Sequence, residues 1–129
     1  MLWRWAGKPT RKDESTVYIV DDDQSVRRAL RRVVCAQGLH AETFASATDF
    51  LGRHQDNGRP GCLVLDVCMP GLNGLELQAR LQQEDSLLPI VFISGRGDIP
   101  MSVQAMKAGA ISFLTKPFTE DDLMSACRG

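Results

Sequence analysis

The chain has 129 residues, which is long enough for one domain with a full hydrophobic core. Apolar residues make up 43% and charged residues 24%, as in ordinary globular proteins, which excludes a disordered chain. The formal net charge of −1 gives no overall attraction to nucleic acid or to an anionic membrane. No apolar run approaches the roughly 20 residues of a membrane helix, and the N-terminal segment lacks the apolar stretch of a signal peptide. We therefore expect a cytoplasmic protein.

The first segment and the cysteines carry little functional signal. Residues 1–15 are polar and basic without periodicity, so we predict a flexible arm ahead of one domain at residues 16–129. The four cysteines have neither C-x-x-C spacing nor histidines at zinc-ligand spacing. Cys35 and Cys62 lie in apolar runs, and we predict that both are small core residues.

From residue 17 onward, short apolar runs alternate with longer amphipathic segments. We predict five strands, at residues 17–20, 41–44, 62–65, 89–93 and 111–114. Strands that are apolar on both faces and separated by helices indicate a parallel sheet covered on both sides. The pattern therefore predicts an α/β fold.

Five helices fit between and after these strands. In the first, apolar residues recur at helical spacing, and arginines occupy the opposite side, which we predict to be solvated: Val26, Ala29, Leu30, Val33 and Val34, against Arg27, Arg28, Arg31 and Arg32. The second starts at Ser46, and the third follows the capping pair Asn73 and Glu76 and runs to about Glu84. The fourth runs from Pro100 to Gly109, and the last begins at Thr119 and continues to the C-terminus, where it could be truncated.

Four of the five predicted strands are followed by an acidic, hydroxyl or lysine residue. Asp21 and Asp22 follow the first strand, Asp66 the third, Ser94 the fourth and Lys116 the fifth. Ligands of open α/β sheets bind at the carboxyl ends of the strands, so these side chains should meet at one edge. Clustered carboxylates repel one another, and a hard divalent cation such as Mg²⁺ removes that conflict.

This set of groups suits phosphoryl transfer to a carboxylate. A carboxylate can act as a nucleophile toward phosphorus and form an acyl phosphate. Positioning and cationic neutralisation supply most of the catalysis of such a transfer. Lys116 would add a second cation and Ser94 a hydroxyl donor. Asp23 could be a further metal ligand, but a cap of the first helix is favoured, because a carboxylate suits a helix N-terminus.

Four segments carry a family resemblance: Val17-Tyr-Ile-Val-Asp-Asp-Asp23, Leu63-Val-Leu-Asp-Val-Cys-Met-Pro-Gly71, Val91-Phe-Ile-Ser-Gly95 and Phe113-Leu-Thr-Lys-Pro-Phe118. They resemble receiver domains of bacterial two-component response regulators. The run from Ser94 to Met101 and on to Gly109 is similar to the FixJ-type branch. The resemblance covers residues 16–127 and implies a flavodoxin-like (CheY-like) fold, a five-stranded parallel sheet of order 2-1-3-4-5 with helices on both faces.

The resemblance also implies a role for each site residue. The phosphoacceptor falls on Asp66, and the metal-binding acidic pair on Asp21 and Asp22, with the backbone carbonyl of Cys68 as a further Mg²⁺ ligand. The switch hydroxyl falls on Ser94, the phosphate-pairing lysine on Lys116 and the rotating aromatic on Phe113. Phenylalanine keeps the bulk of the family's tyrosine but loses its hydroxyl.

Implied partners follow from the same resemblance. A sensor histidine kinase would supply the phosphoryl group and could dock on the arginine side of the first helix. Phosphorylation could drive formation of a homodimer, and DNA would be reached only through an output domain absent from this chain. The implied activity is a phosphoacceptor switch that assists its own phosphotransfer and slow dephosphorylation, and not a turnover enzyme. The implied output is control of transcription.

Three other functions compete with this interpretation. A phosphohydrolase with Asp66 as nucleophile would commonly carry a second acid two residues later, where this chain has Cys68. A flavin- or nucleotide-binding protein would need a glycine-rich phosphate loop after the first strand, and none is present. A receiver-like scaffold that is never phosphorylated would not need the complete set of acidic, hydroxyl and lysine positions.

Overall fold

The computed structural model describes residues 16–53, 61–67, 73–84, 88–94, 104, 106–110, 112–115 and 118–128. The predicted arm at residues 1–15 lies outside these ranges. Strands and helices alternate in chain order as β1 (Thr16–Val20), α1 (Gln24–Ala36), β2 (His40–Phe44), α2 (Ala47–Arg53), β3 (Gly61–Asp66), α3 (Gly74–Gln83), β4 (Ile90–Ser94), β5 (Ser112–Thr115) and α5 (Glu120–Arg128).

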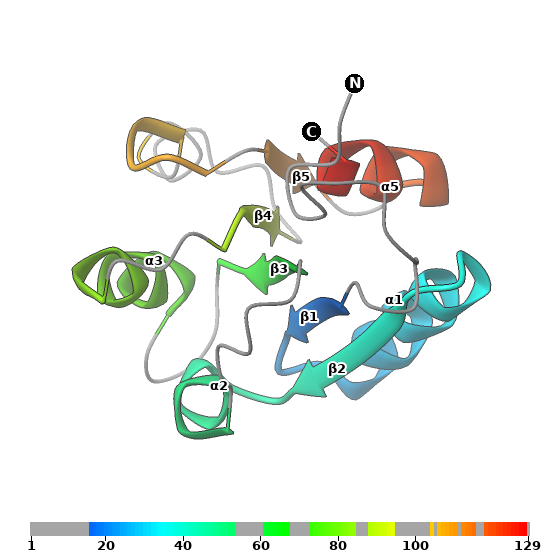
Figure 1. Cartoon of the computed structure of the whole chain (residues 1–129), viewed down its shortest axis with the longest axis horizontal. Coiled ribbons are helices and arrows are strands. Elements are labelled where there is room, and N and C mark those ends of the chain that lie inside the picture. Colours follow the sequence, from blue (N-terminus) through cyan, green and yellow to red (C-terminus); the bar gives the residue numbers. More distant parts are fainter. Residues whose placement is uncertain are drawn as a thin grey trace.

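All five strands are parallel and form one sheet of order β2-β1-β3-β4-β5. Figure 1 shows this sheet in the middle of the molecule, with β2 and β5 at its edges. β1, β3 and β4 are buried along their whole length, as their unbroken apolar runs predicted. The predicted fold class and strand order are therefore confirmed.

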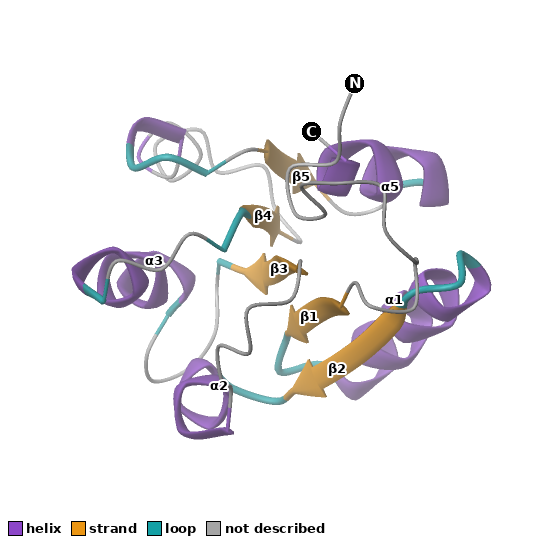
Figure 2. Ribbon diagram, viewed as in Figure 1, coloured by secondary structure: helices purple, strands orange, loops and turns teal. Residues whose placement is uncertain are grey.

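Helices cover both faces of the sheet (Figure 2). One core cluster joins α2 and α3 to the sheet and includes Phe50, Leu63, Leu77 and Phe92. The other joins α1 and α5 to the opposite face and includes Leu30, Val64, Ile93 and Leu123. Residues 63 and 64 point to opposite faces because side chains alternate along a strand.

The helix boundaries follow the capping signals of the sequence. Asn73 and Glu76 form a reciprocal capping box at the start of α3. Thr119 and Asp122 bond in the same way at the start of α5, with Asp122 accepting from the Thr119 backbone at 3.1 Å. Gly38 and Gly109 have φ angles of 80° and 102°, which favour glycine and explain why the helical segments stop there.

The predicted fourth helix lies partly outside the described ranges. Gln104, Met106 and Lys107 are helical, and the Ala108 backbone N–H donates to the Gln104 carbonyl at 3.1 Å. Among the parts of the chain that the model describes, no helix has the length and apolar character needed to cross a membrane.

Candidate functional site

The loop after β1 is fixed by hydrogen bonds on both sides of its acidic residues. The Asp21 backbone N–H donates to the Phe44 carbonyl at 3.2 Å, which ties the loop to the end of β2. The carboxylate of Asp21 accepts from the Asp23 backbone N–H at 2.9 Å. Asp23 is the N-cap of α1 and accepts from the backbone of Ser25 and Val26, so the favoured interpretation of Asp23 is confirmed. The loop therefore holds Asp21 and Asp22 at the carboxyl end of β1.

Asp66 is the last residue of β3 and is almost completely buried. The start of α3 lies directly against this strand end. A Cβ atom on Gly74 would be 2.7 Å from the Asp66 carbonyl oxygen and 2.9 Å from Val67 Cα. Glycine at this position therefore allows the helix to approach the backbone of the strand that carries Asp66.

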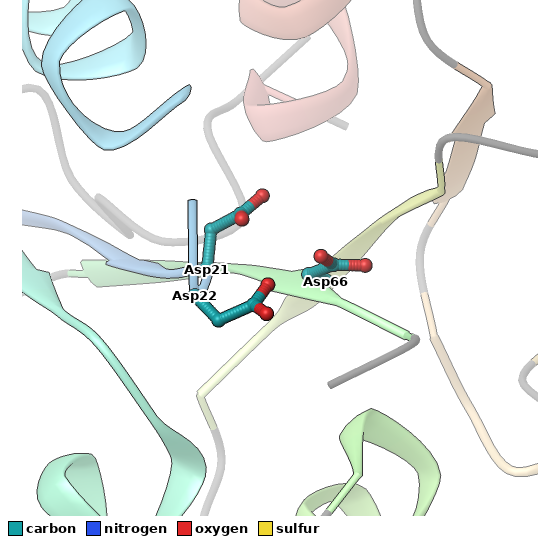
Figure 3. Close-up of side chains that lie close together, drawn as sticks. All are labelled: Asp21, Asp22 and Asp66. Carbon is teal, nitrogen blue, oxygen red and sulfur yellow. The ribbon is translucent and has the colours of Figure 1, made fainter. Parts of the chain in front are cut away.

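Three carboxylates meet between β1 and β3. Asp21, Asp22 and Asp66 each offer one oxygen, and these oxygens all lie within 4.8 Å of one another. Asp21 and Asp66 are buried, whereas Asp22 is exposed, so the cluster opens to solvent on one side. Figure 3 shows the three side chains rising from the loop after β1 and from the end of β3 into one space.

A hard metal ion fits this donor set. Carboxylate oxygens are preferred ligands of Mg²⁺ and Ca²⁺, and neither sulfur nor imidazole takes part in the cluster. Three negative charges this close together repel strongly at the low effective dielectric of a partly buried site. A divalent cation would cancel most of that charge. The cluster could therefore hold a metal ion through oxygen ligands alone.

The next two strands carry the predicted switch residues. Ser94 ends β4 and is buried, with an exposed fraction of 1%. Phe113 lies in β5 opposite Phe92, and the two rings stack with centroids 6.2 Å apart. Phe113 is half-buried and packs against the α2–α3 core cluster. In this conformation its ring thus has both a core contact and a solvent-exposed part.

Two predicted site residues lie outside the described ranges. These are Cys68, whose carbonyl was expected to bind the metal, and Lys116, expected to pair with the phosphoryl group. Their roles stay predictions.

The family model for the response regulator receiver domain matches residues 17–128. The chain belongs to the receiver-domain family. The match confirms the predicted resemblance to response-regulator receiver domains.

Relatives place this receiver domain near the FixJ-type branch. It is 53% identical to the response regulator protein TmoT of Ectopseudomonas mendocina over 117 residues, which is 89% of this chain and 52% of TmoT. It is 41% identical to the transcriptional regulatory protein FixJ of Bradyrhizobium diazoefficiens over 114 residues, 85% of this chain and 53% of FixJ. The crystal structure of FixJ-N matches with a TM-score of 0.80 and 40% identity, over 87% of this chain and 89% of that one. The chain spans about half the length of the curated relatives that it matches.

Sequence reasoning missed a role for one arginine of this receiver domain. Arg27 was assigned to the solvated side of the first helix, but it is half-buried, and its Nη1 donates to the Asp21 carbonyl at 2.7 Å. Arg28, Arg31 and Arg32 are exposed, as predicted. Arg27 thus supports the backbone of the acidic loop. The available signal was an arginine six residues after Asp21, in the first turn of the helix that follows the acidic pair.

The cysteine prediction was half correct. Cys62 is fully buried in the α1–α5 core cluster, as expected. Cys35 is exposed, so its assignment to the core was wrong. It lies one residue beyond Val34 on α1, and that single step turns its side chain about 100° away from the buried stripe.

Proposed function

We propose that this receiver domain, assigned to residues 16–129, accepts a phosphoryl group on Asp66 from a sensor histidine kinase. The observation that carries the proposal is the cluster of Asp21, Asp22 and Asp66 at the carboxyl edge of the sheet. Membership of the receiver-domain family supports it. Asp66 is the candidate nucleophile because it ends the strand between the acidic loop and Ser94.

The chemistry is a phosphoryl transfer between two side chains. A carboxylate oxygen of Asp66 attacks phosphorus while the bond from phosphorus to the imidazole nitrogen of the kinase histidine breaks. The nitrogen keeps the electron pair, and Asp66 becomes an acyl phosphate. Burial of the Asp66 side chain limits access of water to this labile group, which favours slow loss of the phosphoryl group.

Mg²⁺ is the proposed cofactor. Asp21, Asp22, Asp66 and the backbone carbonyl of Cys68 would hold it, and it would neutralise charge on the phosphoryl oxygens during transfer. Asp21 and Asp22 keep their positions through the hydrogen bonds of Asp21 with Phe44, Asp23 and Arg27. These contacts orient the carboxylates before a ligand arrives.

Two residues would report the phosphorylated state to the rest of the domain. The Ser94 hydroxyl would donate to a phosphoryl oxygen, and Lys116 would form an ion pair with another. Movement of Ser94 toward Asp66 would leave space into which the Phe113 ring turns. Phe113 is suited to this because its ring is only half-buried against Phe92.

The output of the switch would be transcription. FixJ, a relative of twice the matched length, is a transcriptional regulatory protein by name. DNA would then be contacted only through an output domain outside the present chain, and the kinase and its regulator would meet in the cytoplasm. The formal net charge of −1 gives the receiver domain itself no general attraction to DNA.

Acetyl phosphate tests this proposal without knowledge of the kinase. Incubation with acetyl phosphate and Mg²⁺ should add the mass of one phosphoryl group to the intact protein. Incubation with excess chelator should leave the mass unchanged, because the site then lacks its cation. A mass increase that is equal with and without Mg²⁺ would contradict the proposed metal role, and no increase in either would contradict the phosphoacceptor role.

A further inference from the structure

Arg27 occupies a position on α1 that helix electrostatics does not favour for a cation. It lies in the first turn of α1, where its backbone N–H donates to the Asp23 carbonyl at 3.0 Å. The partial positive charge of a helix N-terminus favours acidic side chains there and opposes basic ones. A residue that breaks a local preference is expected where tertiary contacts or function decide its identity. For Arg27, that contact is with the acidic loop.

The Arg27 side chain reaches back from α1 to the residue that begins this loop. Side chains of a helix tilt toward its N-terminus, so a long side chain at this position extends toward the loop. The Nη1 of Arg27 donates to the Asp21 carbonyl at 2.7 Å, a short distance that is typical of a charged donor. Arg27 is half-buried, whereas Arg28 beside it is exposed. Partial burial reduces the competition of water for this hydrogen bond.

The bond from Arg27 adds to two other contacts of Asp21. The Asp21 backbone N–H donates to the Phe44 carbonyl, and the Asp21 carboxylate accepts from the Asp23 backbone N–H. In both, the partner contributes a backbone group, which a substitution of its side chain leaves in place. Of these three contacts, the one from Arg27 depends on the identity of the partner's side chain. The order of Asp21 should therefore be sensitive to substitution of Arg27.

We propose that Arg27 is a positioning residue that raises the affinity of the carboxylate cluster for Mg²⁺ by fixing Asp21. This inference rests on the proposed function, in which Asp21, Asp22 and Asp66 bind Mg²⁺. Ligands that are already ordered lose little conformational freedom when a cation binds. Contacts that orient metal ligands typically change metal affinity by about 10- to 100-fold.

Charge and positioning have opposite effects on Mg²⁺ binding. A positive charge near the cluster repels an incoming cation, so loss of that charge alone would strengthen Mg²⁺ binding. Loss of positioning would weaken it, because Asp21 must then be ordered when the ion binds. Arg27→Gln removes the charge and shortens the side chain. Weaker Mg²⁺ binding in Arg27→Gln would therefore report lost positioning, because the charge effect has the opposite sign.

Isothermal titration calorimetry with magnesium chloride measures this affinity in the full chain. Arg27→Gln should bind Mg²⁺ about tenfold more weakly than wild type. Arg27→Lys keeps the charge and a donor but loses the planar guanidinium, so its affinity should lie between those of wild type and Arg27→Gln. Arg28→Gln is the matched control, since it removes an exposed arginine at the next position of α1. Its affinity should stay within about twofold of wild type, because exposed charges are screened by salt.

Amide hydrogen exchange without metal gives a second measurement that requires neither Mg²⁺ nor phosphorylation. The Asp23 N–H donates to the Asp21 carboxylate, so its exchange rate reports how firmly that carboxylate is held. Exchange at Asp23 should be faster in Arg27→Gln than in wild type and unchanged in Arg28→Gln. Amides of the buried strand β3 should exchange at wild-type rates in each variant, which would show that the fold is intact.

The outcomes separate the role of Arg27 from the metal site itself. Equal or tighter Mg²⁺ binding by Arg27→Gln would overturn the role of Arg27 and leave the proposed metal site in place. Weaker binding with unchanged exchange at Asp23 would also overturn it, because affinity would then be lost without loss of order in the loop. Absence of Mg²⁺ binding by the wild type would contradict the proposed function, and this inference with it.

Discussion

Asp22 is the exposed member of the three-carboxylate cluster, and Asp21 and Asp66 are its buried members. An exposed carboxylate can be changed with little effect on packing, so its removal tests the site and not the fold. A cation bound by three carboxylates loses one charged ligand in Asp22→Ala.

We expect Asp22→Ala to weaken Mg²⁺ binding by about tenfold, which corresponds to ~1.4 kcal/mol. Isothermal titration calorimetry would measure the affinity, with Asp121→Ala as a matched control. Asp121 is also an exposed aspartate, but it lies in the first turn of α5. Equal Mg²⁺ affinities in wild type and Asp22→Ala would rule out Asp22 as a ligand.

Because the Cys62 thiol is buried, we expect the free energy of unfolding to decrease at alkaline pH. Its pKa is raised by the hydrogen bond to Cys127 and by burial, so the folded protein keeps a proton that the unfolded chain releases above pH about 8.5. The stabilisation from this group is complete below that pH and is lost progressively as the pH rises toward the folded pKa.

The free energy of unfolding should therefore fall above pH about 8.5, by at most ~1.4 kcal/mol per pH unit from this group. Urea denaturation between neutral pH and pH about 10 would measure it. Cys62→Ala should be less stable overall but should show a shallower alkaline decline. Parallel declines in the two proteins would contradict a raised pKa for Cys62.

At the scale of elements, α3 is held against the strand that carries Asp66. Gly74 is the contact point, because a Cβ atom there would overlap the Asp66 carbonyl and the Val67 backbone. Gly74→Ala should cost about 1–3 kcal/mol of stability through this overlap. Gly52 in α2 is the control, since a Cβ there would meet nothing within 4 Å.

Gly52→Ala should raise stability by up to about 1 kcal/mol, because alanine favours a helix more than glycine does. Thermal or urea unfolding of both variants gives the comparison. A stable Gly74→Ala protein would mean that α3 can move away from β3 without cost. In that case α3 would not fix the position of Asp66.

The elements also show what sequence patterns can and cannot predict. Capping residues such as Asn73, Thr119 and Asp23 act within four residues of their own position, so the local sequence is sufficient. The contact of Gly74 with the Asp66 backbone, and the packing of Cys62 and Cys127 in one core cluster, join different elements of the chain. Their partners depend on tertiary packing, which periodicity does not encode.

Site prediction had the same limit. The three aspartates could be brought together from sequence because parallel strands align their carboxyl ends at one edge. The Arg27 bond to the Asp21 carbonyl could not be inferred from helical periodicity alone, which placed Arg27 with the solvent-facing arginines. Arg27 is half-buried, whereas Arg31, one helical turn later, is exposed.

At the scale of the whole molecule, phosphorylation is expected to change self-association. Ser94 and Phe113 lie on the adjacent strands β4 and β5. We propose that the fourth helix, β5 and α5 form the interface of the dimer. Met106 in this region has an exposed fraction of 46% and is the one exposed large apolar side chain among the described residues. Coupling between a site and such a surface is typically about 1–3 kcal/mol, so the dimer population should shift without an absolute switch.

Analytical ultracentrifugation with Mg²⁺, with and without beryllofluoride as a phosphoryl mimic, would measure this shift. We expect a 5- to 100-fold tighter dimer with the mimic, which is roughly the range of that coupling. Met106→Glu should weaken the dimer in the activated state, because it places charge on the proposed interface. An unchanged sedimentation profile at high protein concentration would contradict phosphorylation-driven dimerisation.

The central claim is that Asp66 carries the phosphoryl group, and a pair of variants tests it most directly. Asp66→Asn keeps the size of the side chain but removes the nucleophilic carboxylate. Asp23→Asn makes the same chemical change at the N-cap of α1, where asparagine also caps well. After incubation with acetyl phosphate and Mg²⁺, intact mass spectrometry should show one added phosphoryl group on wild type and Asp23→Asn and none on Asp66→Asn. A phosphorylated Asp66→Asn protein would contradict the assignment.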